Sequence, residues 1–158
     1  MRIIALLFLI LLPMVGISQR LSTTFNDDFS RWRFDGKSIN TTFSGDYNNW
    51  TANGIKIRTI FHDDWNQWKI NNAISLKTIF HDDFGSWEIT GNGKTIKVRT
   101  TFNNDFERWQ ISGDADGSIS TIFMKDFSRW NIDVEFAGLS EDIKLAIVFI
   151  AIFAGINQ

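Results

Sequence analysis

A ten-residue aromatic pattern that occurs six times constrains the fold of this chain more than any other feature of its sequence. Each copy reads Thr, then Thr or Ile, Phe, two variable residues, Asp, an aromatic residue, two variable residues and Trp. We number these positions 1 to 10; the copies occupy residues 23–32, 41–50, 59–68, 78–87, 100–109 and 121–130. Successive copies start 18, 18, 19, 22 and 21 residues apart, and all of the variation falls between one Trp and the next Thr. The pattern predicts one structural unit repeated in tandem and joined by connectors of tolerant length.

The residues on either side of the variable centre of each copy have the pattern of β-strands. In the third copy, apolar residues and Thr alternate with basic residues over 55–61, which is typical of a half-buried strand. The alternation resumes at Trp68 and Ile70. A hairpin between the two segments puts both apolar sets on one face, with Phe61 opposite Trp68 and Thr59 opposite Ile70. We therefore predict a two-stranded hairpin in each repeat.

The connectors between copies support hairpins independently. Asn53-Gly54 is a strong two-residue turn signal, and it pairs Trp50 with Ile57 on the same apolar face. Residues 35–36 and 91–93 carry similar signals. The sequence thus predicts an all-β fold, an antiparallel meander of about 12 short strands. One alternative stays open: positions 3, 7 and 10 also match a helical stripe, which would give a β-rich solenoid of strand-plus-helix units.

The carboxyl-terminal segment, residues 140–157, predicts a hydrophobic helix. Ser140 is a suitable N-cap, and the two acidic residues that follow it favour the positive end of the helix dipole. Residues 143–156 are apolar on every side apart from Lys144. A helix of this length measures about 21 Å, which is short for a bilayer, so we expect burial in protein, with a membrane-tethering tail as the alternative.

Simple geometry provides a place for this helix. Twelve strands tilted by about 40° close into a barrel with a backbone radius of about 12 Å. Inward side chains fill about half of that radius and leave a bore that matches one helix with its side chains. We therefore expect residues 19–136 to form a closed or nearly closed barrel around the carboxyl-terminal helix.

The amino-terminal segment has the features of a signal peptide. A positively charged start, residues 1–2, precedes an apolar run over 3–15, and the small residues Gly16 and Ser18 lie at −3 and −1 of a cleavage site. We predict that residues 1–18 are a signal peptide and that the protein is exported to the periplasm, the cell envelope or the extracellular space. An uncleaved signal anchor is the alternative, although the apolar run is shorter than the roughly 20 residues that span a bilayer.

Composition argues against several classes of function. Hydrophobic residues make up 44% of the 158 residues and aromatic residues 15%, which is enough for one domain with an ordinary core. The formal net charge is −2 and no basic stripe is visible along the sequence, which argues against nucleic-acid binding. The absence of Cys removes disulfides, a thiol nucleophile and zinc–thiolate sites. We expect no cofactor.

The Asp at position 6 and the aromatic residue at position 7 are the candidate binding residues, because hairpins place all copies on one rim. The candidates are Asp28, Tyr47, Asp64, Trp65, Asp83, Asp105 and Asp126. A structural role competes with binding, since Asp at a turn bonds the backbone N–H two residues on. Equivalent positions of neighbouring hairpins lie about 9–10 Å apart, too far for one calcium ion to bridge. The position-7 aromatics either form a lid over the helix end or an exposed binding surface.

Other residues with chemical potential carry weak signals. His62 and His81 occur at the same repeat position, each before two Asp, but solvated turn residues explain them better than a metal site. Residues 114–117 (Asp-Ala-Asp-Gly) copy a fragment of a calcium loop without its later ligands. Trp at position 10 fits core packing better than carbohydrate stacking. A packed barrel offers no cleft for a pair of catalytic carboxylates.

These features together predict a non-enzymatic exported protein with a structural or interaction role. Its partner, a glycan or a protein, does not follow from the sequence, and envelope or membrane association through the carboxyl-terminal segment is a further option. The alternative function is a glycan- or calcium-dependent binding module that uses the rim of Asp and aromatic residues. An enzyme would need one repeat to break the pattern in a cleft, and copies 2 and 6 depart only at positions 4 and 5.

Overall fold

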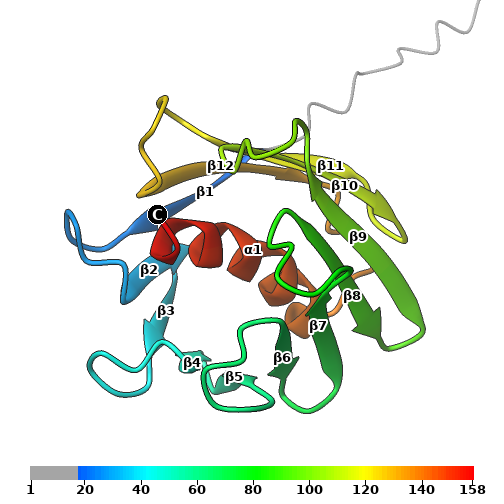
Figure 1. Cartoon of the computed structure of the whole chain (residues 1–158), viewed down its shortest axis with the longest axis horizontal. Helices are drawn as coiled ribbons and strands as arrows, with labels where there is room; N and C mark the ends of the chain where they lie inside the picture. Colours follow the sequence, from blue (N-terminus) through cyan, green and yellow to red (C-terminus); the bar gives the residue numbers. More distant parts are fainter. Residues whose placement is uncertain (1–17) are drawn as a thin grey trace, which may run out of the picture.

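The computed structural model describes residues 18–158, which form a closed antiparallel barrel around one helix (Figure 1). The strands are β1 (Gln19–Thr23), β2 (Arg31–Phe34), β3 (Lys37–Thr41), β4 (Asn49–Ala52), β5 (Ile55–Thr59), β6 (Gln67–Ile70), β7 (Ile74–Thr78), β8 (Ser86–Gly91), β9 (Lys94–Thr100), β10 (Arg108–Gly113), β11 (Gly117–Thr121) and β12 (Arg129–Val134). Helix α1 spans Glu141–Ile156. Each strand pairs with its neighbours in sequence, and β1 pairs with β12 to close the barrel. The predicted meander barrel is confirmed; residues 1–17 of the predicted signal peptide lie outside the described residues.

The register within each repeat differs from the predicted one. Thr59 lies opposite Trp68, and Ile57 lies opposite Ile70. The predicted pairing of Phe61 with Trp68 and of Thr59 with Ile70 was wrong by two residues, because β5 ends at Thr59 and a longer loop replaces the expected turn. A shift of two residues keeps every side chain on its own face of the sheet. The inward apolar set is therefore as predicted, except that Phe61 leaves the sheet.

Tight turns join successive repeats at one end of the barrel, which we call the connector rim. Residues 35–36, 53–54 and 92–93 each provide two successive positive φ angles, as a two-residue type I′ hairpin requires. The Asn53-Gly54 turn places Trp50 opposite Ile57, as predicted. Between β6 and β7, Asn71 and Asn72 adopt φ angles of 48° and 61° in the equivalent place. The local turn chemistry of these residues thus sets which strands pair.

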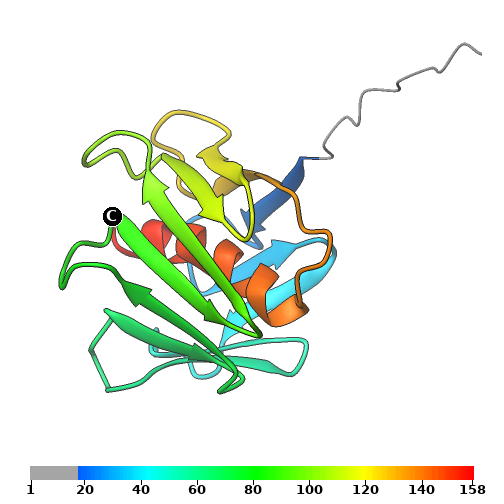
Figure 2. The same ribbon diagram turned by 90° about the vertical axis from the view of Figure 1, so that its right-hand side faces the viewer.

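Helix α1 lies inside the ring of strands (Figures 1 and 2). The Ser140 side chain accepts a hydrogen bond from the Ile143 backbone N–H, which confirms the predicted N-cap. Every residue over 145–155 is buried. At the connector rim, Lys37 Nζ lies 2.8 Å from Glu141 Oε2 and ties the start of the helix to β3. The segment is therefore the filling of the barrel rather than the tethering tail considered as the alternative.

Within residues 18–158, no helix is both long enough and apolar enough to cross a membrane.

The six Trp residues at position 10 form a layer between the strands and the helix. None of them is more than 1% exposed. Trp68 packs edge-on against Phe149 with ring centroids 4.8 Å apart, and Trp87 packs against Phe153 at 5.2 Å. In all six copies the indole Nε1–H donates to the backbone carbonyl of position 7, at 2.7–2.9 Å. The position thus requires a large ring that also carries a donor, which explains why Trp recurs there.

Candidate functional site

The loops inside the six repeats gather at the end of the barrel opposite the connector rim, and we call this end the tip rim. Each loop has seven residues: 24–30, 42–48, 60–66, 79–85, 101–107 and 122–128. The carboxyl end of α1 reaches the tip rim, since a Cβ added at Gly155 would approach the Phe29 ring to 3.1 Å. Figure 2 shows the loops beside the carboxyl terminus. All of the residues predicted as binding candidates lie at this rim.

Each tip loop is built on the same turn. The backbone N–H of the position-6 Asp donates to the carbonyl of the position-3 Phe in every copy, at 3.0–3.3 Å. Position 5 has a positive φ in every copy, between 60° and 76°. Asp, Asn and Gly tolerate this conformation, and they fill five of the six copies, whereas Lys125 holds it in the sixth. The variable centre of the motif is therefore constrained in backbone geometry.

The position-6 carboxylates have the turn role that the sequence predicts. In every copy one carboxylate oxygen accepts the backbone N–H of position 8, two residues on, at 2.9–3.1 Å. A hydrogen bond from the Ser30 side chain lowers the pKa of Asp28, and one from Asn49 lowers the pKa of Asp46. The turn hydrogen bond therefore explains why Asp recurs at position 6, and a role of these residues in binding stays a proposal.

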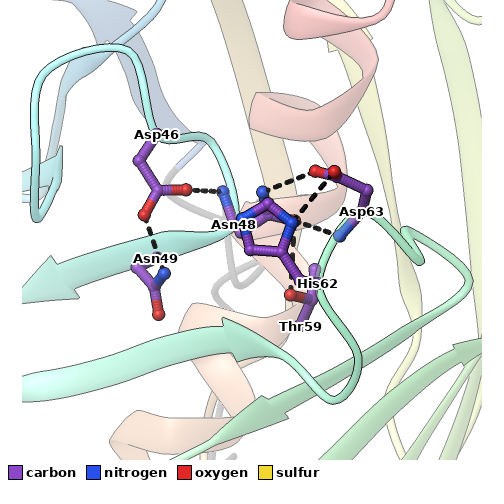
Figure 3. A network of polar contacts seen from close by, with 6 residues as sticks. All are labelled: Asp46, Asn48, Asn49, Thr59, His62 and Asp63. Atoms are coloured by element: carbon purple, nitrogen blue, oxygen red, sulfur yellow. Dashed lines mark hydrogen bonds and ion pairs between the residues drawn. The ribbon is translucent and has the colours of Figure 1, made fainter.

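Side chains also link neighbouring tip loops, as Figure 3 shows for the second and third copies. Asn48 Nδ2 donates to Asp63 Oδ1 at 3.0 Å, and Asn48 Oδ1 accepts the Asp63 backbone N–H at 3.0 Å and the Thr59 hydroxyl at 3.3 Å. The hydrogen bond from Asn48 lowers the pKa of Asp63. Asn66 makes the same three bonds to the fourth copy. These links, which we call clasps, join loops that the sequence pattern treats as separate.

The position-7 aromatics fold inward over the end of the helix. Trp65 and Phe84 lie with ring centroids 5.6 Å and 5.2 Å from that of Phe153. All six rings are only partly exposed and pack against the core. They include Tyr47, whose ring lies 6.0 Å from that of Trp50. Of the two alternatives that the sequence left open, the geometry therefore favours the lid over the exposed binding surface.

The exposed aromatic residues of the tip rim are instead the position-3 phenylalanines, which sequence reasoning placed inside the barrel. Their exposed fractions lie between 57% and 66%. We call this set the Phe ring: Phe25, Phe43, Phe61, Phe80, Phe102 and Phe123. One member, Phe123, lies 5.5 Å below the Arg129 guanidinium. The signal that was missed is that position 3 follows the last ladder residue, so strand alternation no longer applies to it.

Charge is segregated between the tip rim and the outer wall of the barrel. The tip loops hold ten acidic residues and one Lys. Only two acidic residues, Glu88 and Asp133, face outward from the strands. Eleven basic residues face outward: Arg20, Arg31, Arg33, Lys56, Arg58, Lys69, Lys77, Lys97, Arg99, Arg108 and Arg129. These cations are dispersed along the sequence, and folding places them together on the outer face of the sheet. Residues at alternate positions of separate strands become neighbours only when the sheet forms.

Metal-ligating residues do not converge at the tip rim. His62 Nδ1 lies 2.9 Å from Asp63 Oδ2, and His81 makes the equivalent contact at 3.0 Å; both imidazoles are at least 75% exposed. Asp114 caps the backbone instead, since its carboxylate accepts the Thr95 N–H at 2.7 Å. Within residues 18–158, no group of three or more His, Cys, Asp or Glu side chains is arranged to hold a metal ion.

A recess lies at the connector rim, beside the start of α1. Phe34, Phe136 and Leu145 form its apolar wall, and Lys37, Glu141 and Lys144 lie at its edge. Hydrogen bonds from Lys144 and Lys37 lower the pKa of Glu141 to about 2. Because Glu141 already pairs with both lysines, we interpret this recess as part of the contact that attaches the start of α1 to the barrel wall.

Comparison with known proteins gives no relative: the chain matches no protein-family model, no curated protein and no solved structure.

Proposed function

We propose that this chain is an exported, non-enzymatic interaction protein that binds a protein partner through the Phe ring at the tip rim. The observation that carries the proposal is the exposure of all six position-3 phenylalanines, at 57–66%. Contiguous exposed apolar groups on a folded domain mark interaction surfaces. Aromatic residues are also the side chains most enriched at protein interfaces.

The tip loop itself does not require Phe at position 3. Its backbone carbonyl accepts the turn hydrogen bond, and any residue provides that carbonyl. The Phe side chain buries little of its own surface, whereas the Trp side chain at position 10 is fully buried. Six exposed rings in one chain favour association, so their recurrence is best explained by a partner that covers them.

Charge indicates the character of that partner. The Phe ring is interleaved with ten acidic residues of the tip loops. Complementary potentials guide association and exclude wrong partners. We expect a partner surface with apolar pockets flanked by Lys or Arg, because cations also interact favourably with the faces of exposed rings, as Arg129 does with Phe123.

Export is part of the proposal and rests on the sequence of residues 1–18. Cleavage after Ser18 would leave Gln19, the first residue of β1, at the amino terminus. The whole strand that closes the barrel against β12 would then remain in the mature protein. Fractionation of expressing cells into soluble, periplasmic and membrane pools, with amino-terminal sequencing of the mature protein, tests this step.

The binding proposal is tested with the double variant Phe61→Ser and Phe80→Ser. Mature protein immobilised on a surface is exposed to an envelope extract, and retained proteins are identified and then titrated in purified form. We expect a partner whose affinity falls about 100-fold or more for the variant, as for loss of two interface anchors. Lys97→Gln on the outer wall is the control and should bind as the wild type does. Equal binding by both variants contradicts the proposal.

A glycan- or calcium-dependent module at the same rim is the second candidate. The exposed rings with carboxylates between them are the observation that favours a glycan, while the separate turn role of each Asp disfavours calcium. Isothermal titration with calcium, and a glycan array probed with and without calcium, distinguish these ligands from a protein partner. Loss of glycan binding in Tyr47→Ala or Trp65→Ala at unchanged stability would favour the module, although both rings now belong to the lid.

A further inference from the structure

A groove on the outer wall of the barrel brings cations, amides and an aromatic ring together. It runs along β4 and β5 from Phe43 at the tip rim to Asn72 at the connector rim. Lys56 and Arg58 line it from β5, and Asn49 lines it from β4. All of these side chains except Asn49 are exposed. The groove is distinct from the tip rim and shares only Thr42 and Phe43 with it.

The cations of the groove are positioned but not neutralised. Arg58 Nη2 donates to Asn72 Oδ1 at 2.8 Å, which holds the guanidinium along the wall. Arg58 lies opposite Asn49 on one side and opposite Lys69 on the other. Within residues 18–158, none of the ion pairs involves Lys56, Arg58 or Lys69. Three cations on two adjacent strands therefore lack a carboxylate partner.

The equivalent pair of cations on β9 has a carboxylate beside it, unlike the pair on β5. Lys97 and Arg99 on β9 occupy the same places as Lys56 and Arg58 on β5, with the same alternation around them. Lys97 lies directly across from Glu88 on β8. A carboxylate among the cations lowers the local positive potential there, so the β5 site is the stronger anion site of the two.

We propose that the groove over β4 and β5 binds an anionic saccharide, a sugar chain that carries carboxylate or sulfate groups. Lys56 and Arg58 would bind the anionic groups through charge-assisted hydrogen bonds. Asn49 Oδ1, whose amide nitrogen already donates to Asp46, would accept a hydrogen bond from a sugar hydroxyl, and the Phe43 ring would lie against the apolar face of a sugar ring. A few placed polar groups beside an apolar surface are typical of small-ligand sites.

The surroundings favour a short anionic chain over a nucleic acid. Strands of four or five residues span about 13–17 Å, so the cationic stretch is short. Acidic rims border it, with ten acidic residues in the tip loops and six at or near the connector rim. A nucleic acid gains affinity from about 6–10 phosphate contacts, and the acidic rims would repel phosphates beyond the groove.

Isothermal titration of the mature protein with a heparin-derived hexasaccharide, which carries sulfate and carboxylate groups, tests the proposal. We expect binding that Lys56→Gln with Arg58→Gln weakens by at least about tenfold, because two charged hydrogen-bond donors are lost. The matched pair Lys97→Gln with Arg99→Gln should change the affinity by less than about twofold. Phe43→Ala should weaken binding and Phe80→Ala, an equally exposed member of the Phe ring, should not.

Two further probes separate the possible results. Maltohexaose, a neutral hexasaccharide, should not bind, because it carries no anionic group for Lys56 and Arg58 to bind. A single-stranded oligonucleotide should bind more weakly than the hexasaccharide. The proposal is overturned if the hexasaccharide does not bind, if both double variants weaken it equally, or if the oligonucleotide binds at least as tightly through Lys56 and Arg58. The Phe ring shares only Phe43 with this groove, and the Phe61 and Phe80 variants test it separately.

Discussion

The Trp layer and the Phe ring recur equally in the sequence but occupy opposite environments. Each of the six tryptophans is at most 1% exposed, whereas each of the six phenylalanines is at least 57% exposed. The indole is needed for its volume and for its N–H, which donates to the position-7 carbonyl. Position 3 is needed by the fold only through its backbone. The recurrence of Trp therefore reflects packing of the core, whereas we attribute the recurrence of Phe to binding at the surface.

Removing the helix should disrupt the Trp layer more than any single substitution. Deletion of residues 140–158 leaves the inward rings without Phe149 and Phe153, the partners against which they pack. We expect an aggregating or molten product that keeps far-ultraviolet but loses near-ultraviolet circular dichroism. Deletion of residues 157–158 alone is the control and should leave the spectra unchanged. A stable monomeric barrel without the helix would contradict the role assigned to it.

Single substitutions in the third repeat compare the two aromatic sets directly. Trp68→Ala removes a fully buried ring, so it should lower the free energy of unfolding by about 3–5 kcal/mol. Phe61→Ala removes a ring that is 64% exposed and should lower it by less than about 1 kcal/mol. Urea denaturation followed by circular dichroism measures both. Equal losses would show that the Phe ring is structural after all.

The clasps should contribute an intermediate amount. Asn66→Ala leaves the Asp82 backbone N–H and the Thr78 hydroxyl without their acceptor, and it should cost about 1–3 kcal/mol of unfolding free energy. Ser30→Ala, at the same position of the first copy, is the matched control, because the Ser30 side chain bonds only Asp28, within its own loop. A smaller loss for Asn66→Ala than for Ser30→Ala would argue against clasps between loops.

Stability should also fall in acid. The folded-state pKa is lowered for Asp28, Asp46, Asp63 and Asp82 by hydrogen bonds, and for Glu141 to about 2. A lowered folded-state pKa means that the stabilisation is complete above the unfolded-state value, about 4, and is lost as the pH falls toward the folded-state value. The urea midpoint measured from pH 6 to pH 2 should decrease mainly below pH 4. In Glu141→Gln this decrease should be smaller, and an unchanged profile would show that the helix attachment does not contribute.

The smallest expected effect concerns Trp65, the one Trp at position 7. Its Nε1 is buried, and no residue in the described part of the chain accepts its proton. Four other copies have Phe there. Trp65→Phe removes the unpaired donor and some of the contact with Phe153, so the unfolding free energy should change by less than about 1 kcal/mol. A loss of 2 kcal/mol or more, in the same urea titration, would mean that the indole N–H has a bonding role.

Local patterns account for the parts of the fold that the sequence predicts correctly. Two-residue turns such as Asn53-Gly54 have few alternative conformations, so they determine the pairing of β4 with β5. Ser140 and the apolar segment after it are enough to predict a buried helix. The turn role of the position-6 Asp follows from the geometry of its own side chain. Each of these features depends on residues a few positions apart.

The candidate site was predicted less well, for a physical reason that Phe61 illustrates. Alternation predicts the face of a residue only while the strand continues, and the ladder of β5 ends two residues before Phe61. In all six repeats the strand ends at position 1. In the third copy, Asn48 of the preceding copy bonds the residues at and beyond this end, donating to Asp63 and accepting the Thr59 hydroxyl. Those partners are 15 and 11 residues apart, and no spacing rule connects them.

The sequence by itself determined the repeat, the inward apolar set, the tight connectors and the helix, because period and turn chemistry act over a few residues. Only the tertiary structure decided that the position-3 rings are exposed, that the position-7 rings cover the helix end and that the wall cations lie together. These outcomes depend on closure of β1 against β12 and on strand neighbours that are brought together by the sheet. Closure converts positions that are 18 to 22 residues apart into a continuous ring, and the surfaces proposed for binding exist only after that step.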